Sequence, residues 1–402
     1  MHSVVVTGMG CVTAAGIGVD TLWNAAVKGQ SQVKKLTFER AFRQRISHAA
    51  HLVDFDPTEL IDEEQMRYCD RFTQFALFAT DEALRQAGLD TTIPMGDRTA
   101  VIIGSGIGGA GSNDDAHYNF YVAHERGEPM TVPRVMPNAA TSQVCIKYRC
   151  SGPSFAISSA CSSAAQSIGV GFQMVQSGMV DRAIVGGSEA LLTPSAFRAW
   201  EGMRVLTPEL CRPFSKQRTG MVLGEGAASF VIETKASAAE RGASVLCEIV
   251  GYGTTTDAFD IIRPSSDGQV ACIQQALDGA GIAPDQIGYI NAHGTGTVLN
   301  DIVETEAIRG AFGAHSDRVP VSSTKPIHGH AMGAAGGIEL AITIQALIEN
   351  TAPPTINWKA PDPRCDLDVV PNEARPIQAD YALSNSFAFG GINAALVVKA
   401  AN

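Results

Sequence analysis

The sequence predicts an α/β protein built around a largely parallel or mixed sheet. Short β-branched runs, such as 4–6, 100–103 and 183–185, alternate along the chain with helical stretches rich in small residues, such as 161–176. This alternation of strands and helices is typical of α/β folds. Glycine supplies 40 of the 402 residues and aromatic residues only 6%, so we expect closely packed elements and many tight turns.

A second cycle of strands and helices begins near residue 245. The run 245–250 leads into Gly251-Tyr252-Gly253, as the run 4–6 leads into Thr7-Gly8-Met9-Gly10, where we expect the first strand to end in a turn. A strand at 287–291, a helix at 338–348 and a strand at 395–398 complete the second cycle. We therefore expect two duplicated halves, near 1–240 and 241–402, packed intimately because no linker separates them.

Composition excludes several classes of function. The chain has 30 Lys and Arg against 41 Asp and Glu, a net charge of −11, and general nucleic-acid binding needs concentrated cationic residues. No uncharged apolar stretch reaches the ~20 residues of a membrane span. The first residues lack the basic segment of a signal peptide, and nine cysteines without a C-x-x-C pair disfavour a disulfide scaffold. We expect a cytoplasmic protein with no nucleic-acid or membrane partner.

Two glycine motifs imitate dinucleotide-binding turns. Residues 7–18 resemble the glycine-rich turn of short-chain dehydrogenases, and residues 104–109 match G-x-G-x-x-G. The acidic residue expected ~20 positions later is missing from clear register in both places. None of the seven tyrosines has a lysine four positions on. Both motifs are therefore interpreted as tight strand-to-helix turns, and no nucleotide cofactor is expected.

Cys161 lies at a turn between a strand and a helix of small residues, in Pro153 to Ala165. The helix dipole there favours a thiolate, and free N–H groups could hold an oxyanion. A buried structural cysteine is the alternative. His293 and His330 lie among residues of little bulk, where a substrate could approach. His328-x-His330 could suggest a metal pair, but no cluster with ligand spacing accompanies it, so no metal is expected.

Together these residues resemble the β-ketoacyl-[acyl carrier protein] synthases of the thiolase superfamily, the elongating synthase II type. The resemblance runs from residue 4 to residue 393. It rests on the cysteine turn, Arg212-Pro213-Phe214-Ser215 with Gly224-Glu225-Gly226, His293-Gly294-Thr295-Gly296-Thr297, Ser322-Ser323-Thr324-Lys325 with Gly329-His330, and Phe387-Ala388-Phe389-Gly390-Gly391. It implies a five-layer α-β-α-β-α fold of two duplicated halves, usually dimeric, and a decarboxylative Claisen condensation.

The resemblance also implies roles for individual residues. Cys161 would carry the acyl chain as a thioester, and neutral His293 and His330 would donate to the malonyl thioester oxygen. The backbone N–H groups of Cys161 and Phe389 would form a second oxyanion hole, with Phe389 as a gate. Lys325 would orient the histidines, with Glu339 as its ionic partner.

Substrate contacts follow in the same way. Thr295 and Thr297 match positions that hold a pantetheine arm, and Ile107, Trp200 and Phe387 match positions near the acyl chain. The implied partner is acyl carrier protein, whose phosphopantetheine carries the substrates, so no separate cofactor is expected. Because acyl carrier proteins are acidic, docking on this acidic chain needs a local basic patch, for which Arg204, Arg67 and Arg71 are the candidates.

Several positions depart from the family pattern. Ala388 stands where a glycine is usual, Asp260 and Ile262 stand where His and Thr are common, and His328 replaces a small or hydroxyl residue. These changes favour a specialised polyketide, polyene or lipid pathway as an alternative to housekeeping fatty-acid synthesis. A catalytically silent chain-length-factor-like partner subunit is the alternative from another class. The dimer partner could be a second copy or a related subunit.

Overall fold

The structure is a computed structural model that describes residues 1–40 and 42–401. Its centre is an 11-stranded sheet in which strands from the start and the end of the chain meet. The first half contributes β1 (Val4–Thr13), β5 (Thr99–Gly104), β6 (Ser154–Ile157), β7 (Arg182–Glu189) and β8 (Gly226–Thr234), with β2 (Gly16–Ile17) beside β1. The second half contributes β9 (Cys247–Thr256), β10 (Ile287–Asn291), β11 (Val321–Ser322), β14 (Tyr381–Ala388) and β15 (Ile392–Ala400).

The two halves repeat one pairing pattern. In the first, β1 pairs antiparallel with β8, β8 antiparallel with β7, and β7, β5 and β6 run parallel. In the second, β9, β15 and β14 pair antiparallel in turn, and β14, β10 and β11 run parallel. The halves join where β1 pairs with β9. The predicted duplication is therefore present, while the boundaries at 240 and 241 stay a prediction.

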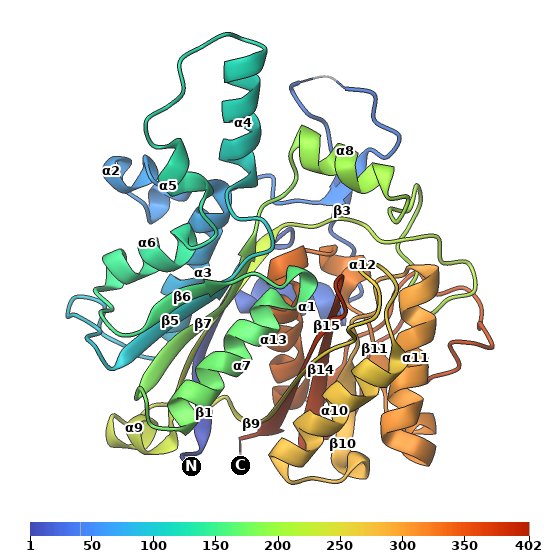
Figure 1. Ribbon diagram of the computed structural model, residues 1–402. Coiled ribbons are helices and arrows are strands. Elements are labelled where there is room, and N and C mark those ends of the chain that lie inside the picture. Colours follow the sequence, from blue (N-terminus) through green and yellow to red (C-terminus); the bar gives the residue numbers. More distant parts are fainter. Residues whose placement is uncertain (41, 402) are drawn as a thin grey trace.

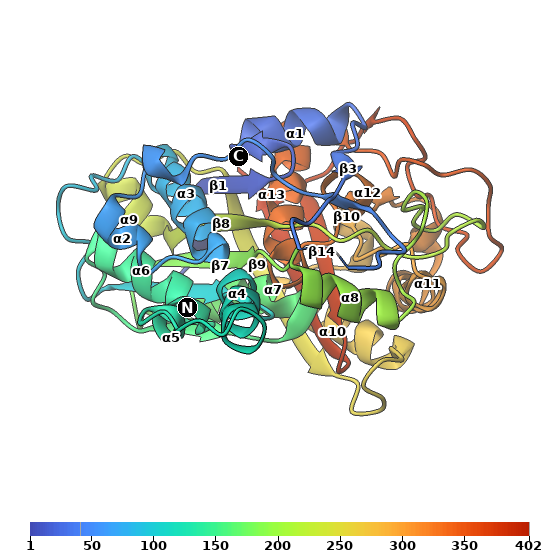
Figure 2. The same ribbon diagram turned by 90° about the horizontal axis from the view of Figure 1, so that it is seen from above.

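Helices cover both faces and fill the middle. α7 (Ser163–Gln176) and α13 (Ala335–Ile348) lie in the inner layer, where each contacts strands of both halves. α3 (Arg71–Gln86) and α6 (Ala139–Tyr148) cover the outer face of the first half, and α10 (Ser266–Ala280) and α11 (Val298–Phe312) that of the second. Figures 1 and 2 show this five-layer order from two sides. The α13 residues from 335 to 347 are all buried, as expected for an inner helix.

One local prediction was wrong. Thr7–Gly10 is not a turn, because β1 runs on to Thr13 past a register shift near Gly8. A Cβ on Gly8 would collide with the carbonyl of Ala83 in α3, and one on Gly253 would collide with the carbonyl of Cys272 in α10. These strand glycines therefore let an outer helix lie directly on the backbone. The correspondence between β1 on α3 and β9 on α10 is another sign of duplication.

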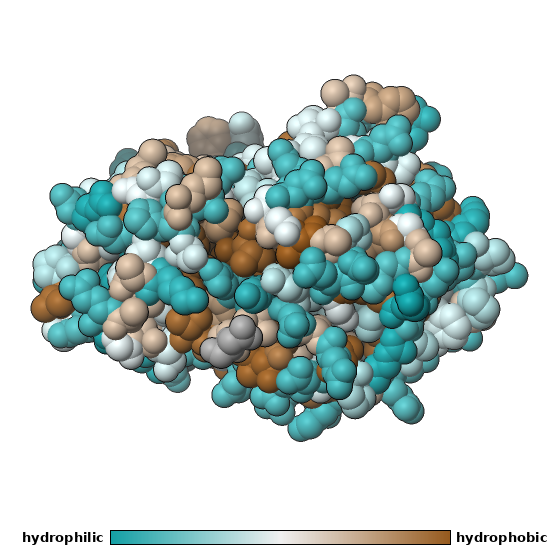
Figure 3. All heavy atoms as spheres, turned by 90° about the horizontal axis from the view of Figure 1, so that it is seen from below, coloured by the Kyte–Doolittle hydropathy of each residue, from teal (hydrophilic) through white to brown (hydrophobic). Residues whose placement is uncertain are grey.

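The remaining elements lie around this core. They are α1 (Val19–Val27), α2 (Glu63–Met66), α4 (Ala110–Tyr121), α5 (Thr131–Val135), α8 (Pro194–Gly202), α9 (Lys235–Glu240), α12 (Lys325–His328), β3 (Val33–Lys35), β4 (His48–Ala50), β12 (Thr351–Ala352) and β13 (Arg375–Pro376), with short 3-10 turns between them. In Figure 3, seen from below, hydrophilic residues cover most of the surface and hydrophobic residues form separate groups near its middle. No helix among the described residues has the length and apolar character needed to cross a membrane.

Candidate active site

Cys161 lies in a strained turn at the start of the inner layer. The chain leaves β6, passes through a 3-10 turn at Ala160–Ser162 and enters α7 at Ser163. The helix therefore begins two residues later than the predicted start at Cys161. Ala160 has a φ of 51°, a left-handed conformation that non-glycine residues rarely adopt. The Ser163 hydroxyl holds the turn, because it accepts from the Ser159 N–H at 2.9 Å and donates to the Ala160 carbonyl at 2.7 Å. The turn thus presents Cys161 at the N-terminal end of α7.

Two histidines from the second half meet this cysteine. His293 follows β10, and His330 follows α12. Nε2 of His330 lies 3.2 Å from Sγ of Cys161, and the two imidazole rings are 5.3 Å apart and nearly perpendicular. All three side chains are buried. The fold therefore brings together the cysteine and the two histidines that the sequence singled out.

Lys325 decides which nitrogen of His293 carries the proton. Its Nζ donates to the His293 carbonyl at 2.5 Å and lies 3.3 Å from Nδ1, and it forms a buried ion pair with Glu339. Because an ammonium group only donates, Nδ1 accepts, and the proton of the neutral imidazole must be on Nε2. His293 therefore offers an N–H donor to the cavity.

This tautomer also bears on metal binding. One possible ligand atom each from Cys161, His293 and His330 lies within 4.8 Å of the others, a spacing that a metal ion could close. A metal needs the free lone pair of an imidazole nitrogen. In His293 the free lone pair faces Lys325 rather than the cavity, so the arrangement suits hydrogen-bond donation better than metal ligation.

Burial sets the protonation states of the site. It raises the pKa of the Cys161 thiol to about 12, although Lys325 and the backbone N–H of Phe389 act to lower it. Burial, and then the charge of Lys325, holds the pKa of His293 and of His330 well below the usual range. Burial therefore favours the thiol in this state, whereas the helix N-terminus was expected to favour the thiolate. The resting site holds a thiol and two neutral imidazoles.

A cavity of about 310 Å³ opens onto these groups. Thr295 and Thr297 line it, with their hydroxyl oxygens 2.9 Å apart. The Trp200 and Phe389 rings stack at 6.0 Å with an angle of 19° between their planes. The sequence-predicted residues in its wall are Cys161, His293, His330, Thr295, Thr297, Trp200, Arg204, Phe387 and Phe389.

The loop carrying Phe389 is tied to a neighbouring loop. The Gly390 N–H donates to the Ile261 carbonyl, and the Asp257 N–H donates to the Gly391 carbonyl, both at 2.8 Å. Gly391 has a φ of 66°, and a Cβ there would lie 2.5 Å from the Cβ of Asp257. Ala388 is the last residue of β14 and pairs with Ile392, so the departure from glycine there creates no backbone strain.

Other predicted residues lie elsewhere. Ile107 is 47% exposed and does not line the cavity. Arg71 pairs with Glu225 at 2.8 Å and donates to the Leu52 carbonyl at 2.7 Å, so its guanidinium is committed within the fold. Arg67 borders a separate surface hollow. Of the three docking candidates, only Arg204 is exposed at this cavity.

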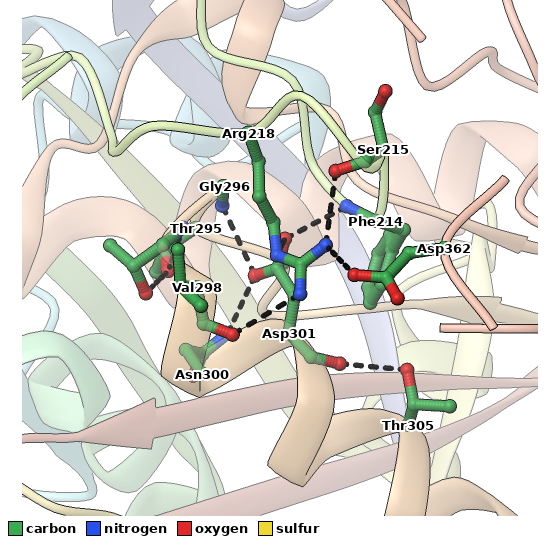
Figure 4. A network of polar contacts seen from close by, with 12 residues as sticks. Phe214, Ser215, Arg218, Thr295, Gly296, Val298, Asn300, Asp301, Thr305 and Asp362 are labelled. Atoms are coloured by element: carbon green, nitrogen blue, oxygen red, sulfur yellow. Dashed lines mark hydrogen bonds and ion pairs between the residues drawn. The ribbon is translucent and has the colours of Figure 1, made fainter. Parts of the chain in front are cut away.

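The charged groups beneath the loop that carries Thr295 and Thr297 were not apparent from the sequence (Figure 4). Asp301 accepts from the N–H of Phe214 at 2.8 Å and from that of Gly296 at 3.1 Å. Arg218 lies between two acids, with Nη1 2.8 Å from Asp362 and Nε 3.9 Å from Asp301. Side chains of all three are nearly inaccessible, so the network fixes the loop that carries Thr295 and Thr297.

Two buried glutamates were missed as well. Glu304 accepts from the N–H groups of His293 and Gly294, both at 2.7 Å. Glu189 accepts from backbone N–H groups on two loops near Cys161. Burial raises the pKa of each carboxyl to about 7, against the effect of these hydrogen bonds. In the sequence, Glu304 could have been found only as an acidic residue in the first turns of the helix that follows His293. No sequence motif indicates Glu189.

The chain is similar to known proteins along nearly its whole length. Residues 1–238 match the N-terminal domain of beta-ketoacyl synthases, and residues 246–359 match the C-terminal domain. A 3-oxoacyl-[acyl-carrier-protein] synthase 2 of Staphylococcus aureus (strain COL) is 42% identical, and Nodulation protein E of Rhizobium sp. (strain N33) is 39% identical, each over 98% of both chains. The solved ishigamide ketosynthase/chain length factor superposes with a TM-score of 0.95 over the full length of both chains, at 31% identity.

Proposed function

Because the chain belongs to the beta-ketoacyl synthase family, we propose that Cys161, His293 and His330 perform a decarboxylative Claisen condensation. The enzyme is an acyltransferase that carries out the condensation of fatty-acid or polyketide synthesis. It would join a malonyl unit on acyl carrier protein to an acyl chain held on Cys161. The observation that carries this assignment is the 3.2 Å contact between Cys161 and His330, with His293 beside it in the same cavity.

Acyl transfer comes first. The Cys161 sulfur attacks the acyl thioester of the carrier protein while its proton passes to Nε2 of His330, which is neutral and within reach. The negative charge forms on the carbonyl oxygen, where the N–H groups of Cys161 and Phe389 stabilise it. The carrier thiolate then leaves and takes up the proton. The products are acyl-Cys161 and a free carrier thiol.

Decarboxylation follows once malonyl-carrier protein is bound. The bond between the carboxylate carbon and the methylene carbon breaks, CO₂ leaves, and the electron pair is delocalised onto the thioester oxygen. Nε2–H of His293, whose tautomer Lys325 sets, and an N–H of His330 stabilise this enolate. The carbanion then attacks the carbonyl carbon of acyl-Cys161, the carbon–sulfur bond breaks, and the Cys161 thiolate leaves and takes up one proton from solvent. The product is a β-ketoacyl chain on the carrier protein.

The carrier protein would dock at the mouth of the cavity. Arg204 is exposed there, where its positive charge suits an acidic partner despite the chain's net charge of −11. Thr295 and Thr297 line the route to Cys161 and would hydrogen-bond the phosphopantetheine arm. The substrates arrive on this arm, so the reaction needs no separate cofactor. We place the enzyme in the cytoplasm, where its carrier-bound substrates would be made.

A related subunit or a second copy would bind along the edge of the sheet. Among the described strands, β6 pairs with β5 only, and an unpaired edge is a template for another chain. Phe155 on β6 is 40% exposed, Ile146 on α6 is 66% exposed and Ile107 is 47% exposed. We propose dimerisation through this face, with Ile107 close to the acyl end of the partner's site.

The test is covalent loading. Incubation with acyl-carrier protein should add the mass of one acyl group, located on Cys161 by peptide mapping. Addition of malonyl-carrier protein to the acylated enzyme should then give a β-ketoacyl chain on the carrier protein. The second candidate, a silent partner subunit, is favoured only by the resemblance to a ketosynthase/chain length factor. An unmodified Cys161 would support that role and reject the enzyme assignment.

A further inference from the structure

Glu189 occupies an unusual place between two loops near the nucleophile. It is the last residue of β7 and is fully buried. It does not line the cavity that holds Cys161. Its carboxylate accepts four hydrogen bonds, from the N–H groups of Gly106 at 2.7 Å, Ile107 at 3.3 Å and Gly333 at 3.0 Å and from the hydroxyl of Ser105 at 3.2 Å.

These donors belong to two segments far apart in sequence. One segment follows β5, and the other follows His330. The segments touch, because a Cβ on Gly333 would collide with the backbone nitrogen of Gly106 and would lie 2.6 Å from Oε2 of Glu189. The carboxylate therefore holds two backbone segments together at a point where they lie too close for a side chain to fit between them.

Met332 stands between this carboxylate and the nucleophile. Its φ of 40° is positive, a strained conformation for a side chain of its size. Its Sδ lies 3.9 Å from Sγ of Cys161, and the side chain lines the cavity. The peptide bond after Met332 carries the N–H of Gly333, and this N–H donates a hydrogen bond to Glu189. The hydrogen bond thus fixes the peptide plane that holds Met332 in its strained position.

We propose that Glu189 is a positioning residue that keeps Met332 against Cys161 and so shapes the wall where an acyl chain must lie. The inference rests on the proposed role of Cys161 as acyl carrier. It assigns to Met332 a place in the wall beside the acylated sulfur, whereas Glu189 itself touches no substrate.

The chemistry of the carboxylate makes the proposal testable. Each of its oxygens accepts from two donors, so Glu189→Gln would turn an NH₂ group toward N–H groups and lose half of the acceptors. Glu189→Asp keeps both acceptors on a shorter side chain. We expect Glu189→Gln to acylate Cys161 at least tenfold more slowly at saturating acyl-carrier protein, with KM within twofold of wild type. Glu189→Asp should recover to within threefold.

The matched control is Glu233→Gln. Glu233 is a fully buried carboxylate of β8 that pairs with Arg241, away from the cavity. A loss of acylation in Glu233→Gln as large as in Glu189→Gln would overturn the proposal, since general destabilisation would explain both. Glu189→Gln acylating within twofold of wild type would overturn it as well. Absence of loading in wild type would instead reject the proposed function.

A double-mutant cycle tests the link to Met332. Met332→Leu keeps the bulk of the side chain without the thioether. In that background Glu189→Gln should slow acylation by a factor at least threefold smaller than in wild type, because the two residues act through one peptide. Additive effects would overturn the link. If circular dichroism shows that Glu189→Gln does not fold, the same cycle with Glu189→Asp decides, with coupling of at least twofold expected and additivity overturning the link.

Discussion

Nε2 of His330 lies 3.2 Å from Sγ of Cys161, although 169 residues separate them along the chain. The pair is a thiol and a neutral imidazole, since burial raises the pKa of the thiol and lowers that of the imidazole. Nucleophilic attack therefore needs proton transfer within the pair. The first prediction follows from this contact: Cys161→Ala abolishes covalent loading, measured as a mass gain after incubation with acyl-carrier protein. Loading of the alanine variant at another residue would contradict the assignment.

His293→Ala should impair decarboxylation more than acyl transfer. Its Nε2–H is the donor aimed at the cavity, whereas the close contact with Cys161 is made by His330. Loss of one oxyanion donor typically costs ~10²–10³ in rate. We expect a loss of that size in CO₂ release from malonyl-carrier protein, with Cys161 loading reduced much less. Unchanged CO₂ release would remove His293 from the reaction.

Arg204→Glu should weaken turnover of carrier-bound substrates. The side chain is exposed at the cavity mouth, and charge reversal there would repel an acidic partner. KM for acyl-carrier protein should rise about tenfold, equivalent to about 1.4 kcal/mol, while a short pantetheine thioester is used as well as before. Arg67→Glu, at a separate hollow, is the matched control and should change neither. An equal loss with both substrates would refute a docking role.

The buried Lys325–Glu339 pair should couple stability to activity. Lys325→Met leaves the Glu339 carboxylate buried without its partner, and breaking such a pair typically costs ~3–5 kcal/mol. Urea titrations should show this loss as a lower free energy of unfolding. The double variant Lys325→Met/Glu339→Leu should recover most of the lost free energy. Both variants should decarboxylate malonyl-carrier protein slowly, since neither fixes the His293 tautomer. Normal CO₂ release in the double variant would show that the tautomer needs no help from Lys325.

His328 should make the fold sensitive to acid. Burial, and then the charge of Lys325, lowers its pKa to about 3, against about 6.5 in an unfolded chain. Below pH 6.5 the unfolded state binds a proton that the folded state does not, so the stability contributed by neutral His328 is complete above pH 6.5 and is lost as pH falls. The free energy of unfolding should therefore drop by about 1 kcal/mol per pH unit between pH 6 and 5 from this group.

His328→Gln removes that contribution. The slope of unfolding free energy against pH should become flatter by the same amount, measured by urea titrations at several pH values. The other buried histidines are present in both proteins, so they cancel in the comparison. Equal slopes for wild type and variant would show that His328 is protonated to the same extent in both states.

The local elements were predictable because their signals are local. Alternating β-branched runs predicted most strands, and the cysteine turn and the histidine motifs predicted the chemistry before any contact was known. The exception at Thr7–Gly10 is instructive: its glycines serve close helix packing across the sheet rather than a turn. The glycines at 104–109 likewise lack the acidic residue of a dinucleotide-binding motif in clear register. In the structure the Gly106 N–H donates to Glu189.

By itself the sequence determined the fold class, the duplication and which cysteine and two histidines to propose as the catalytic set, because these depend on residue types and short spacings. Only the tertiary structure decided how they work. Burial kept Cys161 a thiol, Lys325 set the proton of His293 on Nε2, and Arg71 proved to be paired within the fold. These properties depend on lost hydration and on partners distant in sequence, which no local pattern records.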